Sequence, residues 1–147
     1  MPINGNAAEH LYEGVREFRK QTGEKFSLVA FEVFLSVALA PAQTTELLAE
    51  ESGLSLSGIS RILASLGRVN RSGEPGMGLI EGVRDPQEPR RTIYFLTEKG
   101  RETVTELLRA TQGISPKNVT LYPMVTAREF LDDWKPDPSR MRRKGRN

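Results

Sequence analysis

Residues 44–66 read TTELLAEESGLSLSGISRILASL and contain two short amphipathic segments separated by a glycine. Thr44 or Thr45 has a side chain suited to cap the first helix, and Gly53 is suited to end it. Ser55 or Ser57 begins the second helix only three or four residues later. Apolar residues recur there at helical spacing: Ile59, Ile62, Leu63 and Leu66. The stretch therefore predicts two helices joined by a tight turn.

Two helices that cross this closely need a small residue in the first, a glycine in the turn and apolar anchors in the second. Ala49, Gly53 and Ile59 stand at those positions. The outer face of the second helix is then small or polar throughout: Ser55, Ser57, Gly58, Ser60, Arg61, Ala64 and Ser65. Such a face fits the major groove of DNA, which is about 12 Å wide.

The pattern therefore predicts a helix-turn-helix unit that binds double-stranded DNA. We expect Arg61 to reach a guanine edge, while the hydroxyls of Ser55, Ser57, Ser60 and Ser65 meet phosphates and Thr44 adds a backbone contact. The alternative for Arg61 is a solvated or salt-bridged surface arginine. The alternative for the serines is a role as caps and helix-surface residues.

A second DNA-binding element is predicted after the two helices. The apolar runs LIEGV (79–83) and TIYFL (92–96) are separated by RDPQEPRR (84–91), which indicates a β-hairpin with a charged tip. Arg84, Arg90 and Arg91 flank this tip, and a basic wing of this kind lies along the DNA backbone or enters the minor groove. The same arginines could instead pair with Asp85 and Glu88 inside the hairpin, and we expect one of the three to do so.

The connection between helix and hairpin, RVNRSGEPGMG (68–78), is polar and rich in glycine. It is either a second loop that contacts the DNA backbone through Arg68 and Arg71 or a flexible spacer.

Helices are expected on both sides of this central segment. Asn6 should cap a first helix over residues 7–21, and Ser27 should begin a buried helix that Pro41 stops. Thr97 should cap a helix after the hairpin, and TAREFLDDW (126–134) predicts one more short helix. The fold class is therefore mainly α with a small β-hairpin wing.

Composition excludes several other function classes. The chain of 147 residues has no cysteine and one histidine, which excludes disulfides, thiolate zinc sites and cysteine nucleophiles. It also has no glycine-rich phosphate loop, catalytic carboxylate pair or nucleophile–base set. We therefore expect no enzyme activity, cofactor or metal site. Because no apolar run reaches about 18 residues and the N-terminus has no leader pattern, we expect a cytoplasmic protein.

Positive charge is concentrated in a central segment, residues 53–101, with eight basic against five acidic side chains, and in the C-terminal tail. Residues 135–147 carry six basic side chains against one acidic one, a net charge of +5, so the rest of the chain carries −3 of the total of +2. This tail is expected to be disordered. Its possible roles are a non-specific DNA arm, a solubilising terminus or a contact for another protein. The overall basic charge therefore does not itself argue for DNA binding.

Residues 26–111 resemble the MarR family of bacterial transcriptional regulators, in which the recognition helix is followed by a wing and a helix opening with Leu-Thr-x-x-Gly. Leu96, Thr97 and Gly100 match this opening, Asp85 matches the wing aspartate eleven residues before it, and Arg90 falls on a usual wing arginine. The chain departs from the family pattern at Gln87, where an arginine is frequent, in the longer connection, and in its short, proline-broken C-terminal region.

The resemblance implies a winged helix-turn-helix homodimer joined by its N- and C-terminal helices and bound to a pseudo-palindromic site. With its short C-terminal region, this chain is expected to dimerise through the first helix, Phe130 and Trp134. A ligand pocket between the dimerisation helices and the DNA-binding lobe is also implied, although no residue specifies a small-molecule effector. We predict a domain over residues 1–134 with its core at 26–111, followed by the tail.

The predicted function is that of a sequence-specific, homodimeric transcriptional repressor. One alternative is a winged-helix protein that binds DNA for the replication or segregation of a mobile element. The other is a winged-helix module that recruits a protein. The long connection and the basic tail are compatible with both of these alternatives.

Overall fold

The computed structural model describes residues 5–23, 27–68, 72–112 and 125–136. Within these ranges the elements are α1 (Gly5–Thr22), α2 (Leu28–Leu39), β1 (Gln43–Thr44), α3 (Thr45–Ser52), α4 (Leu56–Leu66), β2 (Ile80–Arg84), β3 (Thr92–Leu96), α5 (Glu98–Gln112) and α6 (Ala127–Asp133). Arg71 and most of the predicted basic tail, residues 137–147, lie outside the described residues. The element order otherwise follows the sequence prediction, and the short strand β1 with its pairing to β3 is an addition.

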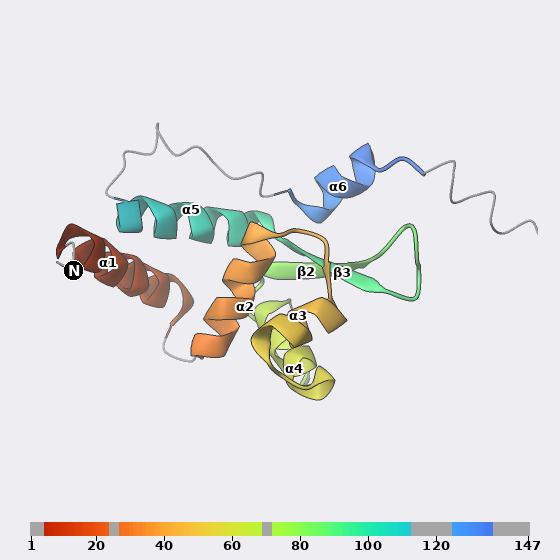
Figure 1. The fold of residues 1–147 in the computed structure, drawn as a ribbon, viewed down its shortest axis with the longest axis horizontal. Coiled ribbons are helices and arrows are strands. Elements are labelled where there is room, and N and C mark those ends of the chain that lie inside the picture. Colours follow the sequence, from red (N-terminus) through yellow and green to blue (C-terminus); the bar gives the residue numbers. More distant parts are fainter. Residues whose placement is uncertain (1–4, 24–26, 69–71, 113–124, 137–147) are drawn as a thin grey trace, which may run out of the picture.

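The three strands form one antiparallel sheet in the order β1-β3-β2, and β2 and β3 extend beyond the helices as a hairpin (Figure 1). Gly82 pairs with Tyr94 and Val83 with Ile93. The two-residue β1 pairs Gln43 with Tyr94. Neither residue of β1 lies in an apolar run, so the pairing depends on β3 being placed beside it.

The two faces of the sheet pack against different helices. Because strand side chains alternate between faces, Ile80 and Leu96 share one face and join the main core with α2, α4 and α5. Ile93 and Phe95 point to the other face, where they cluster with Ala127 and Phe130 of α6. The wing is therefore anchored through both faces near its base.

Helix α2 packs against α3, α4, β3 and α5. Ser27 caps α2 as predicted, because its hydroxyl accepts the Ala30 N–H at 3.1 Å. Phe34 is fully buried, and the ring of Phe18 from α1 lies 5.6 Å from it.

The predicted cap at Asn6 is wrong, since α1 already begins at Gly5. One cap is worth only about 1 kcal/mol, and the packing of α1 along α5 outweighs that local preference.

Helix α6 is attached to the back of the sheet by backbone, ionic and aromatic contacts. Thr126 forms a parallel bridge with Leu96 and, with Glu129, makes a capping box. Arg101 of α5 reaches Glu129 at 2.7 Å, and the ring of Phe130 lies 5.0 Å from that of Phe95. Phe130, predicted to serve dimerisation, is thus used within the chain to cover the wing.

Glu129 carries an electrostatic link between α5 and α6. The hydrogen bond from Arg101 and the backbone N–H of Thr126 hold the pKa of Glu129 below its usual value. A lowered pKa in the folded state stabilises the fold at pH above the usual value, and that contribution is lost as the pH falls through the lowered pKa.

We therefore expect α6 to loosen in acid, below about pH 4. Trp134, the only tryptophan of the chain, directly follows α6 and reports on its docking through its fluorescence. An acid titration should show a transition in the native protein that Glu129→Gln removes, because the amide cannot titrate. An unchanged transition in this variant would mean that another carboxyl group controls the docking.

Candidate nucleic-acid interface

Helices α3 and α4 form the predicted helix-turn-helix, and the local signals act as expected. The Thr44 hydroxyl accepts the Leu47 N–H at 3.2 Å and caps α3. Gly53 ends α3 in the left-handed conformation, with φ at +71°, a region that glycine enters without strain. The Ser55 hydroxyl then accepts the Gly58 N–H at 3.1 Å and caps α4. Buried Ala49 and Ile59 lie in the core between the helices.

The outward face of α4 carries the side chains predicted to meet DNA. Ser57 and Arg61 are exposed, while Ser60 is half-buried beside them. Within the described residues, Arg61 makes no ion pair. Its guanidinium is therefore available to an anionic or hydrogen-bonding partner, which the salt-bridged alternative would not allow. The hydroxyls of Ser55 and Ser57 lie 3.1 Å apart and belong to the first turn.

Ser65 is placed differently from the other predicted residues. Its hydroxyl donates to the Ile62 carbonyl at 2.8 Å. It lines a cavity of about 440 Å³ with Gln21 and Thr22 of α1, Ser27 before α2 and Lys99 of α5. Ser65 follows Arg61 by four residues and so lies on the same side of α4, at the end of the helix beside this cavity. This cavity lies between the end of α1, the start of α2, the end of α4, the connection after it and α5.

The tip of the wing is organised by Asp85. Its carboxylate accepts the Gln87 N–H at 2.9 Å and pairs with the Arg91 guanidinium at 2.9 Å. The backbone closes the same turn, because the N–H of Asp85 donates to the Arg91 carbonyl at 2.9 Å. Arg91 is thus the structural arginine that we expected among the three. Arg84 and Arg90 are exposed and make no ion pair with any described residue.

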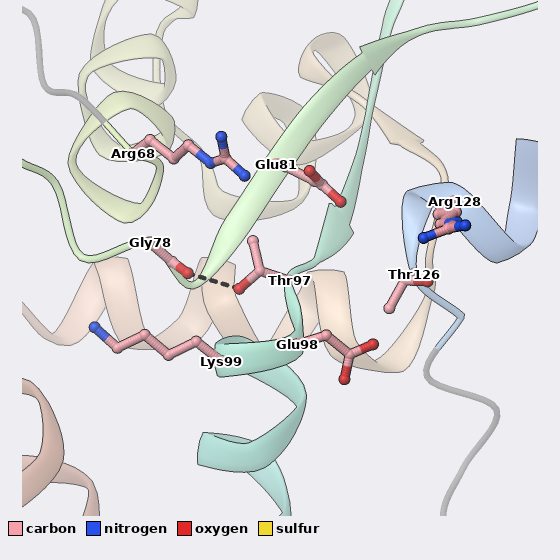
Figure 2. A pocket seen from close by; sticks show the side chains of 8 residues that line it. All are labelled: Arg68, Gly78, Glu81, Thr97, Glu98, Lys99, Thr126 and Arg128. Carbon is pink, nitrogen blue, oxygen red and sulfur yellow. Dashed lines mark hydrogen bonds between the residues drawn. The ribbon is translucent and has the colours of Figure 1, made fainter.

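The Leu-Thr-x-x-Gly segment attaches the base of the wing to α5. Figure 2 shows the Thr97 hydroxyl donating to the Gly78 carbonyl, a contact of 2.6 Å. Lys99 donates to the Met77 carbonyl at 2.8 Å. A Cβ atom on Gly100 would lie 2.0 Å from the Leu79 carbonyl oxygen, so only glycine allows α5 to approach the wing this closely.

The connection after α4 returns to the end of the helix that it leaves. Gly76 donates to the Arg68 carbonyl at 2.8 Å, and three further backbone bonds join residues 77–79 to residues 65–67. A Cβ atom on Gly76 would lie 2.1 Å from the Gly67 carbonyl oxygen. Hydrogen bonds therefore hold the last part of the connection, residues 76–78, against the end of α4, and this part is not a flexible spacer. Arg68 remains exposed at its start, while Arg71 is outside the described residues.

The open cavity drawn in Figure 2 mixes charges of both signs. About 440 Å³ in volume, it is lined by the basic side chains of Arg68, Lys99 and Arg128 together with Glu81 and Glu98. In the described part of the chain, no group of three histidine, cysteine or carboxylate side chains could hold a metal ion. None of the described helices is long and apolar enough to span a membrane.

A helix-turn-helix followed by a β-hairpin that packs on the next helix defines a winged helix-turn-helix fold. Comparison with solved structures shows which winged-helix proteins this fold resembles. The Thermotoga maritima transcriptional regulator Tm0710 matches with a TM-score of 0.58 and 15% identity, covering 92% of this chain and 80% of that one. Streptococcus pneumoniae FabT in complex with DNA matches at 0.53 and 21%, covering 89% and 80%.

The regulator MarR itself matches with a TM-score of 0.51 and 19% identity, covering 98% of this chain and 92% of that one. The chain therefore has the MarR-like winged-helix fold that the sequence predicted. No family model and no curated protein sequence matches it.

Gly100→Ala tests the attachment of the wing. The added methyl group meets the Leu79 backbone, and we expect it to lower the free energy of unfolding by about 1–3 kcal/mol. Urea denaturation followed by circular dichroism measures this change. Glu102→Ala, an exposed alanine substitution on the same helix, should change stability by less than about 0.5 kcal/mol. Equal stabilities of the two variants would contradict the close approach.

Proposed function

We propose that the protein is a homodimeric, sequence-specific DNA-binding transcriptional regulator that represses by occupying its site. The observation that carries this proposal is the grouping of exposed, unpaired arginines on the two elements that a winged helix presents to DNA. Arg61 lies on α4, and Arg84 and Arg90 lie on the wing, with no ion-pair partner among the described residues. Three exposed cations in these places suit a polyanionic duplex.

In this proposal each element has its own task. Helix α4 enters the major groove, where Arg61 donates to a guanine and the first-turn serines meet the adjacent phosphates. Arg84 and Arg90 hold the backbone or the minor-groove edge next to it. Arg91 acts indirectly, by ordering the tip through Asp85. FabT, a structure with the same fold, was solved in complex with DNA, which supports DNA as the partner of this fold.

Dimerisation is proposed through α1. One side of this helix packs along α5 and buries Phe18, but Leu11, Tyr12 and Val15 remain exposed. These three residues follow i, i+1, i+4 spacing and form one apolar strip on the helix surface. A second copy of the chain would cover this strip in a symmetric contact. Two recognition helices about 34 Å apart would then read half-sites one duplex turn apart.

Repression fits a protein that holds one duplex turn of a promoter and leaves it unavailable to other proteins. The proposed place of action is the cytoplasm, where bacterial promoters are accessible.

Selection of bound duplexes from a random pool tests the proposal directly. The selected sites should share an inverted repeat, and their affinity should fall steeply as the salt concentration rises. Equal affinity for every duplex would instead favour a non-specific DNA-binding role.

Arg61→Ala tests base reading by α4. We expect affinity for the selected site to fall by about 1–3 kcal/mol and the preference at one base pair of each half-site to relax. Arg19→Ala removes the same charge from an exposed position in the last turn of α1. It should weaken binding less and leave base preference unchanged. If Arg61→Ala kept the native base preference, another residue would determine that preference.

Val15→Glu tests the dimer. A carboxylate in the middle of the apolar strip would be buried without a partner on association, so we expect a monomer in sedimentation equilibrium at micromolar concentration. Its DNA affinity should fall with the loss of the second half-site contact. Leu28→Glu introduces the same charge at an exposed leucine outside the strip and should remain dimeric. A dimeric Val15→Glu variant would place the interface elsewhere.

A further inference from the structure

We propose that Leu56 determines specificity by contacting the methyl group of a thymine in the bound DNA. This inference rests on the proposed function and adds a second base-reading residue to Arg61. It starts from a leucine that the fold does not use. Leu56 is the first residue of α4 and is 57% exposed, whereas the other leucines of this helix, Leu63 and Leu66, are buried in the core.

The spacing of residues along α4 shows where Leu56 faces. Residues 56, 60 and 63 follow i, i+4, i+7 spacing and therefore share one flank of the helix. At the C-terminal end of that flank, Leu63 and Gly67 line an open crevice of about 370 Å³ against Gly82 and Tyr94 of the wing. Leu56 is at the opposite end of the same flank, next to Ser60. It thus lies on the wing-facing side of the recognition helix, at its N-terminus.

This end of a recognition helix comes closest to the base edges in the major groove. The hydroxyl of Ser55 already accepts the Gly58 N–H there, so the cap serves the helix itself. Leu56 has no hydrogen-bonding group and gains nothing from a phosphate. The thymine methyl group is the apolar group that the major groove displays, and an aliphatic side chain is its natural contact. DNA is therefore the occupant that fits Leu56 at this position.

The test removes the methyl group from the DNA. In the duplex obtained by random-pool selection, each thymine is replaced in turn by deoxyuridine, and the dissociation constant is measured by fluorescence anisotropy. For the native protein we expect one thymine per half-site at which this replacement weakens binding by about fourfold, as burial of a single CH₂-sized group implies. Leu56→Ala should bind the unmodified duplex more weakly and show no further loss on the uridine duplex.

Two control variants isolate the contact. Leu39→Ala shortens a leucine that is 68% exposed at the end of α2, and it should keep the full uridine effect. Leu56→Met retains an apolar side chain of similar volume and should keep most of that effect, which separates contact with the methyl group from a change in the helix. Circular dichroism checks that the helix content of each variant equals that of the native protein.

The inference is overturned if Leu56→Ala keeps the native uridine penalty at every thymine, or if no thymine of a selected site carries a penalty. Either result with a well-defined selected site leaves the proposed regulator function intact. A pool that yields no preferred sequence overturns the proposed function, and this inference with it.

Discussion

The structure depends on the close backbone contact that joins α4, the wing and α5. Residues 76–79 return to the end of α4 through four backbone hydrogen bonds, and α5 approaches Leu79 so closely that position 100 has room only for glycine. Backbone bonds of this kind permit little relative motion. Helix α4 and the base of the wing are therefore one rigid unit, and the spacing between Arg61 and the wing arginines is set by the fold.

The back of the wing adds a second constraint. Helix α6 covers Ile93 and Phe95, which would otherwise be an exposed apolar face of a two-stranded hairpin, and a hairpin alone is marginally stable in water. The link from Arg101 to Glu129 fixes α6 to α5, which carries the wing base on its other side. Helix α6 thus holds the base of the wing from the side opposite the main core.

The charges divide into structural and available groups. Asp85 and Arg91 neutralise each other within the tip, and Arg101 and Arg109 have carboxylate partners on or near their helix. Exposed ion pairs contribute little stability, so the pairing matters mainly for geometry. The arginines without partners among the described residues include those on the outer face of α4 and on the wing. The charges of these arginines are therefore not compensated by any described carboxylate.

The sequence by itself determined the elements whose signals are local. Thr44, Gly53, Ser55 and Thr97 act as helix caps or stops through bonds within three or four residues, and Ile59 and Leu63 indicate the buried side of α4 through their spacing. The exposure of Arg61 on the opposite face follows from the same periodicity. These predictions succeed because capping and amphipathic burial involve neighbours in the chain.

Only the tertiary structure decided the contacts between distant segments. The return of the connection to α4, the pairing of β1 with β3 and the use of Phe130 against Phe95 each join residues far apart in the chain. It also decided that Arg91 belongs to the wing tip and that Leu56 remains exposed. No local pattern encodes these outcomes, since each depends on which surface another element covers.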